Sequence, residues 1–247
     1  MGAPIPDLIG SNKGNAGGTT ATTTVSAASG TVIKFGITVV TNIFAGPLPV
    51  LSVTGTGGLT WDLIGAASGA SEVNSRYYNT SAWWAAAPSG LFSASIEITS
   101  TLAIDCWVSA WESVAGCVSP FIDPNGALPI EIFYNGPSDT PQVGVYSTTD
   151  YADQLFAFVG TNYRLNYGAS TSPAGGAVVV SDSQGGTGFN TAYLGLLTVP
   201  VPAAQSSLTW GNNGATTADE ENWSFVGSAL VGTPPSNRQL FLNPGPF

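Results

Sequence analysis

Hydrophobic and polar residues alternate over most of the chain, and the alternation is clearest between Ser95 and Gly116. In the second half of this stretch, one set of alternating positions is aliphatic and the other carries two tryptophans: Ile104, Cys106, Val108 and Ala110 against Asp105, Trp107, Ser109 and Trp111. Side chains at every second position share one face of a strand, whereas a helix repeats every 3.6 residues. Because both faces carry bulk, we predict two successive strands here, the second of them central in a sandwich.

Similar segments recur along the chain, and we predict about fourteen strands separated by turns rich in Gly, Pro and Asn. In VIKFGITVV at 32–40, Ile33, Phe35, Ile37 and Val39 share one face, which predicts a half-buried strand. Short strands at regular spacing without helical periodicity are typical of sandwiches and jelly rolls. We therefore predict an all-β fold, an antiparallel β-sandwich of jelly-roll-like organisation with extended N- and C-terminal arms.

The two ends of the chain differ from its middle. Residues 1–20 hold several glycines and prolines with little periodicity, and residues 233–247 are proline-bearing yet apolar. We predict an N-terminal arm over 1–20, a sandwich domain over 21–232 and a C-terminal tail over 233–247. No internal repeat is convincing, although two halves of similar strand density meet near 117–140, so a subdivision there stays open. Since exposed apolar residues favour contacts, the tail's candidate assembly residues are Leu240, Phe241, Leu242 and Phe247.

The charge of the chain excludes several classes of partner. Only 8% of residues are charged, and the net charge is −10. Nucleic-acid binding needs clustered Lys and Arg, and the five basic residues here are scattered, so we expect no nucleic-acid partner. An anionic membrane surface is disfavoured for the same reason. The first ten residues, MGAPIPDLIG, predict no signal peptide, and no apolar run reaches the length of a membrane span.

The residue types also limit the chemistry. The chain has no histidine and two cysteines, so Ser-His-Asp and Cys-His nucleophiles and histidine metal sites are excluded. We expect both cysteines to be reduced thiols, Cys106 in the core. Carboxylate pairs for glycoside hydrolysis could be Asp150 with Asp153 or Glu97 with Glu112, but nothing singles out a pair. Asp219, Glu220 and Glu221, together with Asn212 and Asn213, could ligate calcium, but a solvated loop is the interpretation we favour. We therefore predict a non-enzymatic protein without cofactor or metal.

Aromatic residues offer a different kind of site. Tyr163 and Tyr167 lie in a predicted surface loop at 163–176, where stacking on sugar rings would make them glycan contacts. Aromatic residues within strands belong more often to the core, which is our interpretation of Tyr77, Tyr78, Trp83, Trp84, Trp107 and Trp111.

Several stretches together resemble bacteriophage virion proteins of the capsid-decoration, head-fibre or tail-spike kind. These are the Gly/Ala/Thr-rich start, segments such as VTGTGGLTW and WVSAWESVAG, and the tail NRQLFLNPGPF. The resemblance implies a virion location, a homo-oligomer and contacts with other virion or assembly proteins. Some such proteins bind host glycans, so the alternative is a glycan-binding module or adhesin.

Overall fold

The computed structural model describes residues 4–28, 32–41, 48–71, 75–87, 92–135, 142–149, 152–161, 176–185, 191–212 and 222–233. Within these ranges the chain forms fifteen strands and no helix, and all strand pairs are antiparallel. The strands of the first half are β1 (Ile5–Asn15), β2 (Thr20–Ala27), β3 (Val32–Thr41), β4 (Leu51–Gly55), β5 (Asp62–Ser71), β6 (Arg76–Ala86), β7 (Phe92–Ser100) and β8 (Ile104–Ala115). Those of the second half are β9 (Ile130–Asn135), β10 (Gln142–Tyr146), β11 (Asp153–Thr161), β12 (Ala177–Gly185), β13 (Thr191–Val201), β14 (Leu208–Asn212) and β15 (Asn222–Val231).

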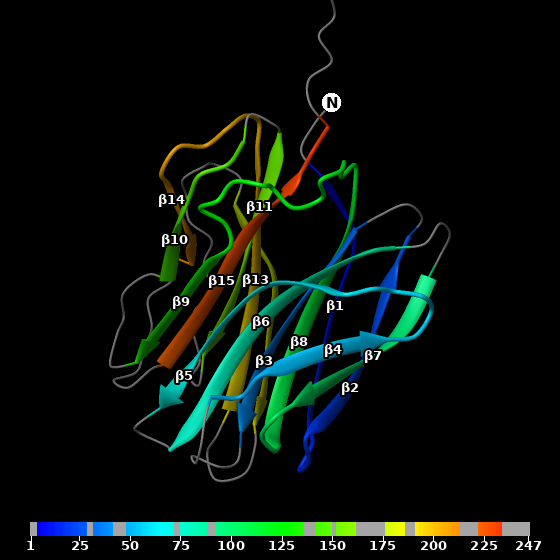
Figure 1. Cartoon of the computed structure of the whole chain (residues 1–247), viewed down its shortest axis with the longest axis vertical. Helices are drawn as coiled ribbons and strands as arrows, with labels where there is room; N and C mark the ends of the chain where they lie inside the picture. The colour runs from blue at the N-terminus through cyan, green and yellow to red at the C-terminus, as the bar shows by residue number, and fades with distance from the viewer. Residues whose placement is uncertain are drawn as a thin grey trace, which may run out of the picture.

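The strands form four sheets stacked in layers (Figure 1). Inner sheet 1 has the order β1-β8-β3-β6-β5, and inner sheet 2 has the order β12-β13-β11-β15-β9. Outer sheet 1, β2-β7-β4, covers inner sheet 1, and outer sheet 2, β10-β14, covers inner sheet 2. Each of the three spaces between the layers contains its own hydrophobic cluster. The all-β sandwich predicted from the alternation is thus confirmed.

The two halves of the chain repeat the same strand order. Reading β9, β11, β12, β13 and β15 as the equivalents of β1, β3, β5, β6 and β8 turns inner sheet 2 into inner sheet 1. Likewise β10-β14 corresponds to β2-β7, and β4 has no counterpart among the described strands. The order 1-8-3-6 facing 2-7-4 is that of a jelly roll. The chain therefore contains two jelly-roll-like halves.

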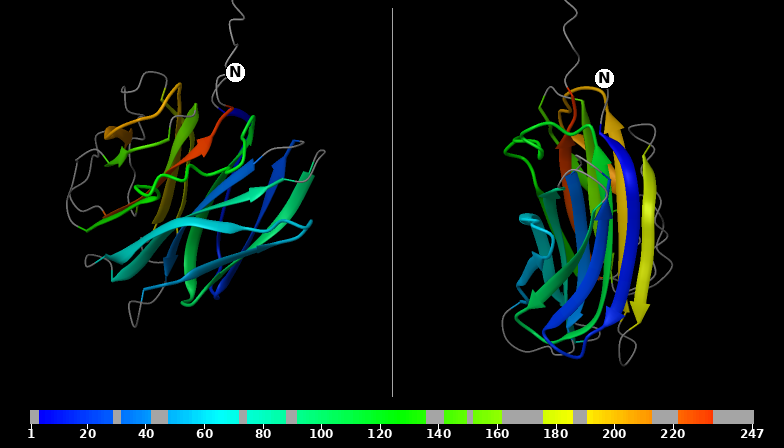
Figure 2. Two further views of the ribbon diagram at one scale, coloured as in Figure 1. Left: turned by 45° about the horizontal axis from the view of Figure 1, so that its top comes forward. Right: turned by 90° about the vertical axis from the view of Figure 1, so that its right-hand side faces the viewer.

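The register of the sheets supports this equivalence. The β5–β6 pair has a register shift between Leu63 and Gly65, and the equivalent β12–β13 pair has one between Val178 and Val180. The inner sheets face each other in reversed order, so that β1 lies against β12 and β5 lies against β9. The edge view in Figure 2 shows β1, in blue, running beside β12, in yellow. Such reversal is the arrangement of two copies related by a two-fold rotation.

The N-terminal segment differs from the predicted arm, because residues 5–15 form β1 at the edge of inner sheet 1. The sequence does not indicate this strand, because two of its three inward positions, Gly10 and Gly14, are glycines. A Cβ at Gly10 would lie 2.6 Å from the Trp111 ring, and one at Gly14 would lie 3.2 Å from the Trp107 ring. The two indoles of β8 occupy the space of the missing side chains, so this strand shows little apolar periodicity.

Two further expectations were incomplete. The segment at 95–116 contains two strands as predicted, but β7 belongs to outer sheet 1 and β8 to inner sheet 1, where it is central. The strand at 32–40 was expected to be half-buried, yet every residue of β3 is buried. Inner sheet 2 covers its second face, which carries Lys34, Gly36 and Thr38.

Candidate functional site

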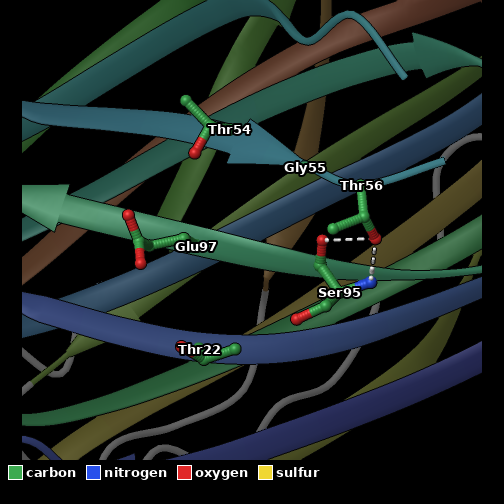
Figure 3. A pocket seen from close by; sticks show the side chains of 6 residues that line it. All are labelled: Thr22, Thr54, Gly55, Thr56, Ser95 and Glu97. Atoms are coloured by element: carbon green, nitrogen blue, oxygen red, sulfur yellow. Dashed lines mark hydrogen bonds between the residues drawn. The ribbon is translucent and has the colours of Figure 1, made fainter. Parts of the chain in front are cut away.

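A shallow, open pocket of about 280 Å³ lies on the solvent face of outer sheet 1 (Figure 3). It is lined by residues of all three strands of that sheet and of the turn after β4: Thr22, Thr54, Gly55, Thr56, Ser95 and Glu97. All six are exposed. The pocket is therefore formed by the pleated sheet itself, with hydroxyl groups around one carboxylate.

The alternation of β7 places Glu97 in this pocket. Ile96 and Ile98 point into the core beneath the sheet, so Glu97 between them points to solvent. In the register of the sheet, Thr22 of β2 is the direct partner of Glu97 on one side and Thr54 of β4 is its partner on the other. One row across three strands thus reads Thr, Glu, Thr.

Hydrogen bonds hold the end of the pocket near β4. The Ser95 backbone N–H donates to Thr56 Oγ1 at 3.1 Å, and the Thr56 N–H donates to the Ser95 carbonyl at 3.0 Å. Beneath this end lies the Trp61 indole, because a Cβ at Gly55 would be 2.9 Å from Trp61 Nε1. Gly55 is thus the residue that lets the indole approach the floor of the pocket.

The chemistry of this surface is hydrogen bonding. A carboxylate accepts hydrogen bonds from hydroxyl groups, and threonine hydroxyls both donate and accept. These are the groups that recognise a polyol such as a sugar. Glycoside hydrolysis requires two carboxyl groups flanking the bond, and Glu97 is the one acid among the pocket's lining residues.

Glu97 and Glu112, one of the two acid pairs that the sequence left possible, do not meet. Glu97 faces solvent on outer sheet 1, whereas Glu112 lies on β8, fully buried and paired with Lys34. The two belong to different layers because β7 and β8 enter different sheets. Of the other possible pair, Asp150 lies outside the described residues and Asp153 begins β11.

Asp153 lies beside an acid that the sequence did not indicate, Asp123. Both side chains are buried. Asp123 Oδ2 accepts hydrogen bonds from the Thr149 N–H at 2.8 Å and from Thr149 Oγ1 at 2.7 Å, while its Oδ1 accepts from the Asn125 N–H at 2.8 Å. Burial, followed by the neighbouring Asp123 carboxyl, raises the pKa of Asp153 to about 8. Asp123 thus fixes two connecting segments, and Asp153 stays protonated at neutral pH.

The aromatic strand residues lie where the pattern predicted. Five of the six interpreted as core are buried, namely Tyr77, Tyr78, Trp83, Trp107 and Trp111, and the half-buried Trp84 packs on Phe121. Both cysteines are free thiols, Cys106 in the core. The loop tyrosines Tyr163 and Tyr167 lie outside the described residues, as do the tail residues Leu240, Phe241, Leu242 and Phe247.

The described part of the chain contains no group of three or more Asp, Glu or Cys residues that could hold a metal ion, and the acidic run at 219–221 falls outside it. In the same residues there is no helix with the length and apolar character of a membrane span. No family model, curated protein or solved structure matched this chain.

Proposed function

We propose that this protein is a non-enzymatic structural component of a virion or comparable large assembly, and that its N-terminal edge strand β1 makes contacts with neighbouring proteins. The observation that carries the proposal is the surface of β1. Ile5 is 67% exposed and Ile9 is 45% exposed on this strand. Exposed apolar side chains on the edge strand of a sheet favour association.

The strand is at the same time held firmly in place. Among the described strands β1 pairs with β8 alone, so it is an edge strand of inner sheet 1. Lys13 Nζ donates to Asp182 Oδ1 of β12 at 2.6 Å, and Ser11 Oγ donates to Asp182 Oδ2 at 3.0 Å. A preformed edge can add a strand from a neighbouring molecule at little ordering cost. The occupant we favour is a second copy of this chain.

The fold is compatible with this use. Jelly rolls recur in viral capsid proteins and in lectins, and here the topology occurs twice in one chain. This is an analogy of fold, which by itself assigns no function.

The experiment is light scattering coupled to size-exclusion chromatography on the full-length chain and on a variant with Ile5→Lys and Ile9→Lys. Lysine on an edge strand opposes edge-to-edge pairing without removing the strand. We expect the wild type to form a defined oligomer and the double variant to lose it. The matched control is Val145→Lys on β10, where an apolar residue is 55% exposed on a different sheet. If the control dissociates the oligomer as well as the double variant does, β1 is not the contact.

The predicted role of the C-terminal tail is tested in the same way, with a chain ending at Thr233. Deleting residues 1–20 would not test the arm by itself, because it would remove β1 and expose β8.

The pocket around Glu97 favours a second candidate function, binding of a glycan on a cell surface. The sequence predicted glycan contacts at Tyr163 and Tyr167, whereas this candidate site uses the polar groups on outer sheet 1. The two functions are compatible in one protein, because the pocket and β1 lie on different sheets.

A further inference from the structure

Three polar side chains meet in the space between the two inner sheets. Lys34 of β3 and Glu112 of β8 are direct partners in the register of inner sheet 1. Gln154 of β11 faces them from inner sheet 2. Lys34 and Glu112 have no exposed surface, and Gln154 is 1% exposed. Such a group is costly to bury, since each polar atom loses its water.

The contacts within this group set up a specific geometry. Lys34 Nζ donates a hydrogen bond to Gln154 Oε1 at 2.8 Å and forms an ion pair with Glu112 Oε2. The Phe156 ring covers the amine, with its centroid 4.9 Å from Nζ. The amine of Lys34 therefore lies beside the side-chain carbonyl of Gln154. It also contacts the Glu112 carboxylate, and the Phe156 ring covers it.

The surroundings favour the reactive form of the amine. Burial lowers the pKa of Lys34, an effect that the charge of Glu112 opposes. Passing one proton from Nζ to Glu112 converts the buried ion pair into two neutral groups and leaves a nucleophilic amine. Cys117 is a further titratable group near this pair, and burial raises its pKa to about 12, so it remains a thiol.

We propose that Lys34 and Gln154 form an intramolecular isopeptide bond in the folded protein, with Glu112 as the proton-transfer group. In the neutral pair, Glu112 carries the first proton and Nζ is an amine, which attacks Cδ of Gln154 and forms a new C–N bond. Glu112 donates its proton to the amide nitrogen of Gln154, whose bond to Cδ then breaks, and it takes up the second proton that Nζ loses. The products are a secondary amide and one molecule of ammonia, and no oxidant or cofactor is needed.

The bond would join the central strands of the two jelly-roll halves. It links β3 to β11 across the layer that holds the halves together, and it closes a loop between residues 34 and 154. Closing a long loop restricts the unfolded chain and so raises stability. This inference is independent of the proposed assembly function, because it concerns a buried site.

The experiment is intact mass spectrometry of the denatured full-length protein, followed by tandem spectrometry of its chymotryptic peptides. We expect a mass lower than that of the sequence by one ammonia and a branched peptide joining Lys34 to Gln154. A full-length protein of unmodified mass after prolonged incubation in the folded state overturns the proposal. Loss of ammonia without the branched peptide, as from cyclisation at an asparagine, overturns it as well.

Three variants locate the chemistry. Glu112→Gln keeps the shape of the side chain but removes the proton acceptor, and we expect it to keep the unmodified mass, as should Lys34→Met. Lys13→Met is the matched control, since this exposed lysine of β1 forms its ion pair with Asp182 of β12, and it should retain the loss of ammonia. Circular dichroism shows whether each variant is folded. A folded Glu112→Gln protein that still forms the branched peptide would refute the role of Glu112.

Discussion

Gly36 of β3 and Phe158 of β11 occupy the same position in the two halves of the chain and lie in contact with each other. The register shifts define the equivalence. In the first half, Gly65 follows the shift and pairs with Ala82, which pairs with Gly36. In the second half, Val180 follows the shift and pairs with Leu196, which pairs with Phe158. A Cβ at Gly36 would overlap the Phe158 ring. The central strands therefore pack through a glycine on one side and a phenylalanine on the other.

This contact predicts the effect of adding one methyl group. Gly36→Ala should destabilise the protein by about 1 to 3 kcal/mol, because both residues are buried and the added Cβ would overlap the ring. The measurement is urea denaturation. Gly18→Ala is the control, since no atom lies within 4 Å of its added Cβ, and it should stay within about 0.5 kcal/mol of the wild type. Equal losses in the two variants would contradict the packing described.

The buried acid pair predicts a dependence of stability on pH. Burial and Asp123 raise the pKa of Asp153 from 3.8 to about 8. Between these values the folded protein keeps a proton that the unfolded chain releases, so the contribution of Asp153 to stability falls as the pH rises through this window. Asp153→Asn, which mimics the neutral acid, should flatten the fall. The measurement is the thermal midpoint from pH 4 to 9, and an unchanged slope in the variant would rule out Asp153 as its source.

The link between β1 and β12 predicts a local change. Although burial acts to raise the pKa of Asp182, hydrogen bonds from Lys13, Ser183 and Ser11 hold it below its usual value. Asp182→Asn weakens this link. Because the ion pair is exposed, the free energy of opening β1 should fall by only roughly 0.2 to 1 kcal/mol. Hydrogen exchange should therefore accelerate in β1, by a factor of about five or less, and stay unchanged in β3. Exchange in β1 that does not respond would mean that β8 alone holds the strand.

The pocket on outer sheet 1 predicts a binding phenotype. If it recognises a glycan, Glu97→Gln should weaken binding about tenfold or more, because hydrogen bonds to a charged acceptor are the stronger ones. A glycan array identifies the ligand, and calorimetry on the best hit gives the affinities. Asp62→Asn, an exposed acid on β5, should bind as the wild type does. Equal glycan binding by the Glu97→Gln and Asp62→Asn variants would exclude the pocket as the binding site.

Strand positions were predictable from the sequence because alternation is a local property. The segments predicted as strands are strands, and the failure at β1 has a local cause, the glycines that face Trp107 and Trp111. The layering was not predictable in the same way. Lys34 reads as a solvent-facing residue of β3, and its burial depends on a second sheet formed more than a hundred residues later.

The site residues show the same limit. Glu97 was recognised as an acid on a strand, but its threonine neighbours on β2 and β4 follow from strand pairing. Asp123 and Asp153 meet through the folding of two connections, which no spacing indicates. The two jelly-roll halves share their topology and register but differ in their residues, as Gly36 and Phe158 illustrate. The amino-acid sequence therefore showed no internal repeat.

The most direct test of the proposed function is native mass spectrometry of the full-length wild-type protein over a range of concentrations. If β1 joins copies of the chain, the spectrum should show a defined multiple of the 25.1 kDa chain mass, and this species should be absent from the Ile5→Lys, Ile9→Lys variant. A wild-type protein that remains a single chain at every concentration would contradict self-association through β1.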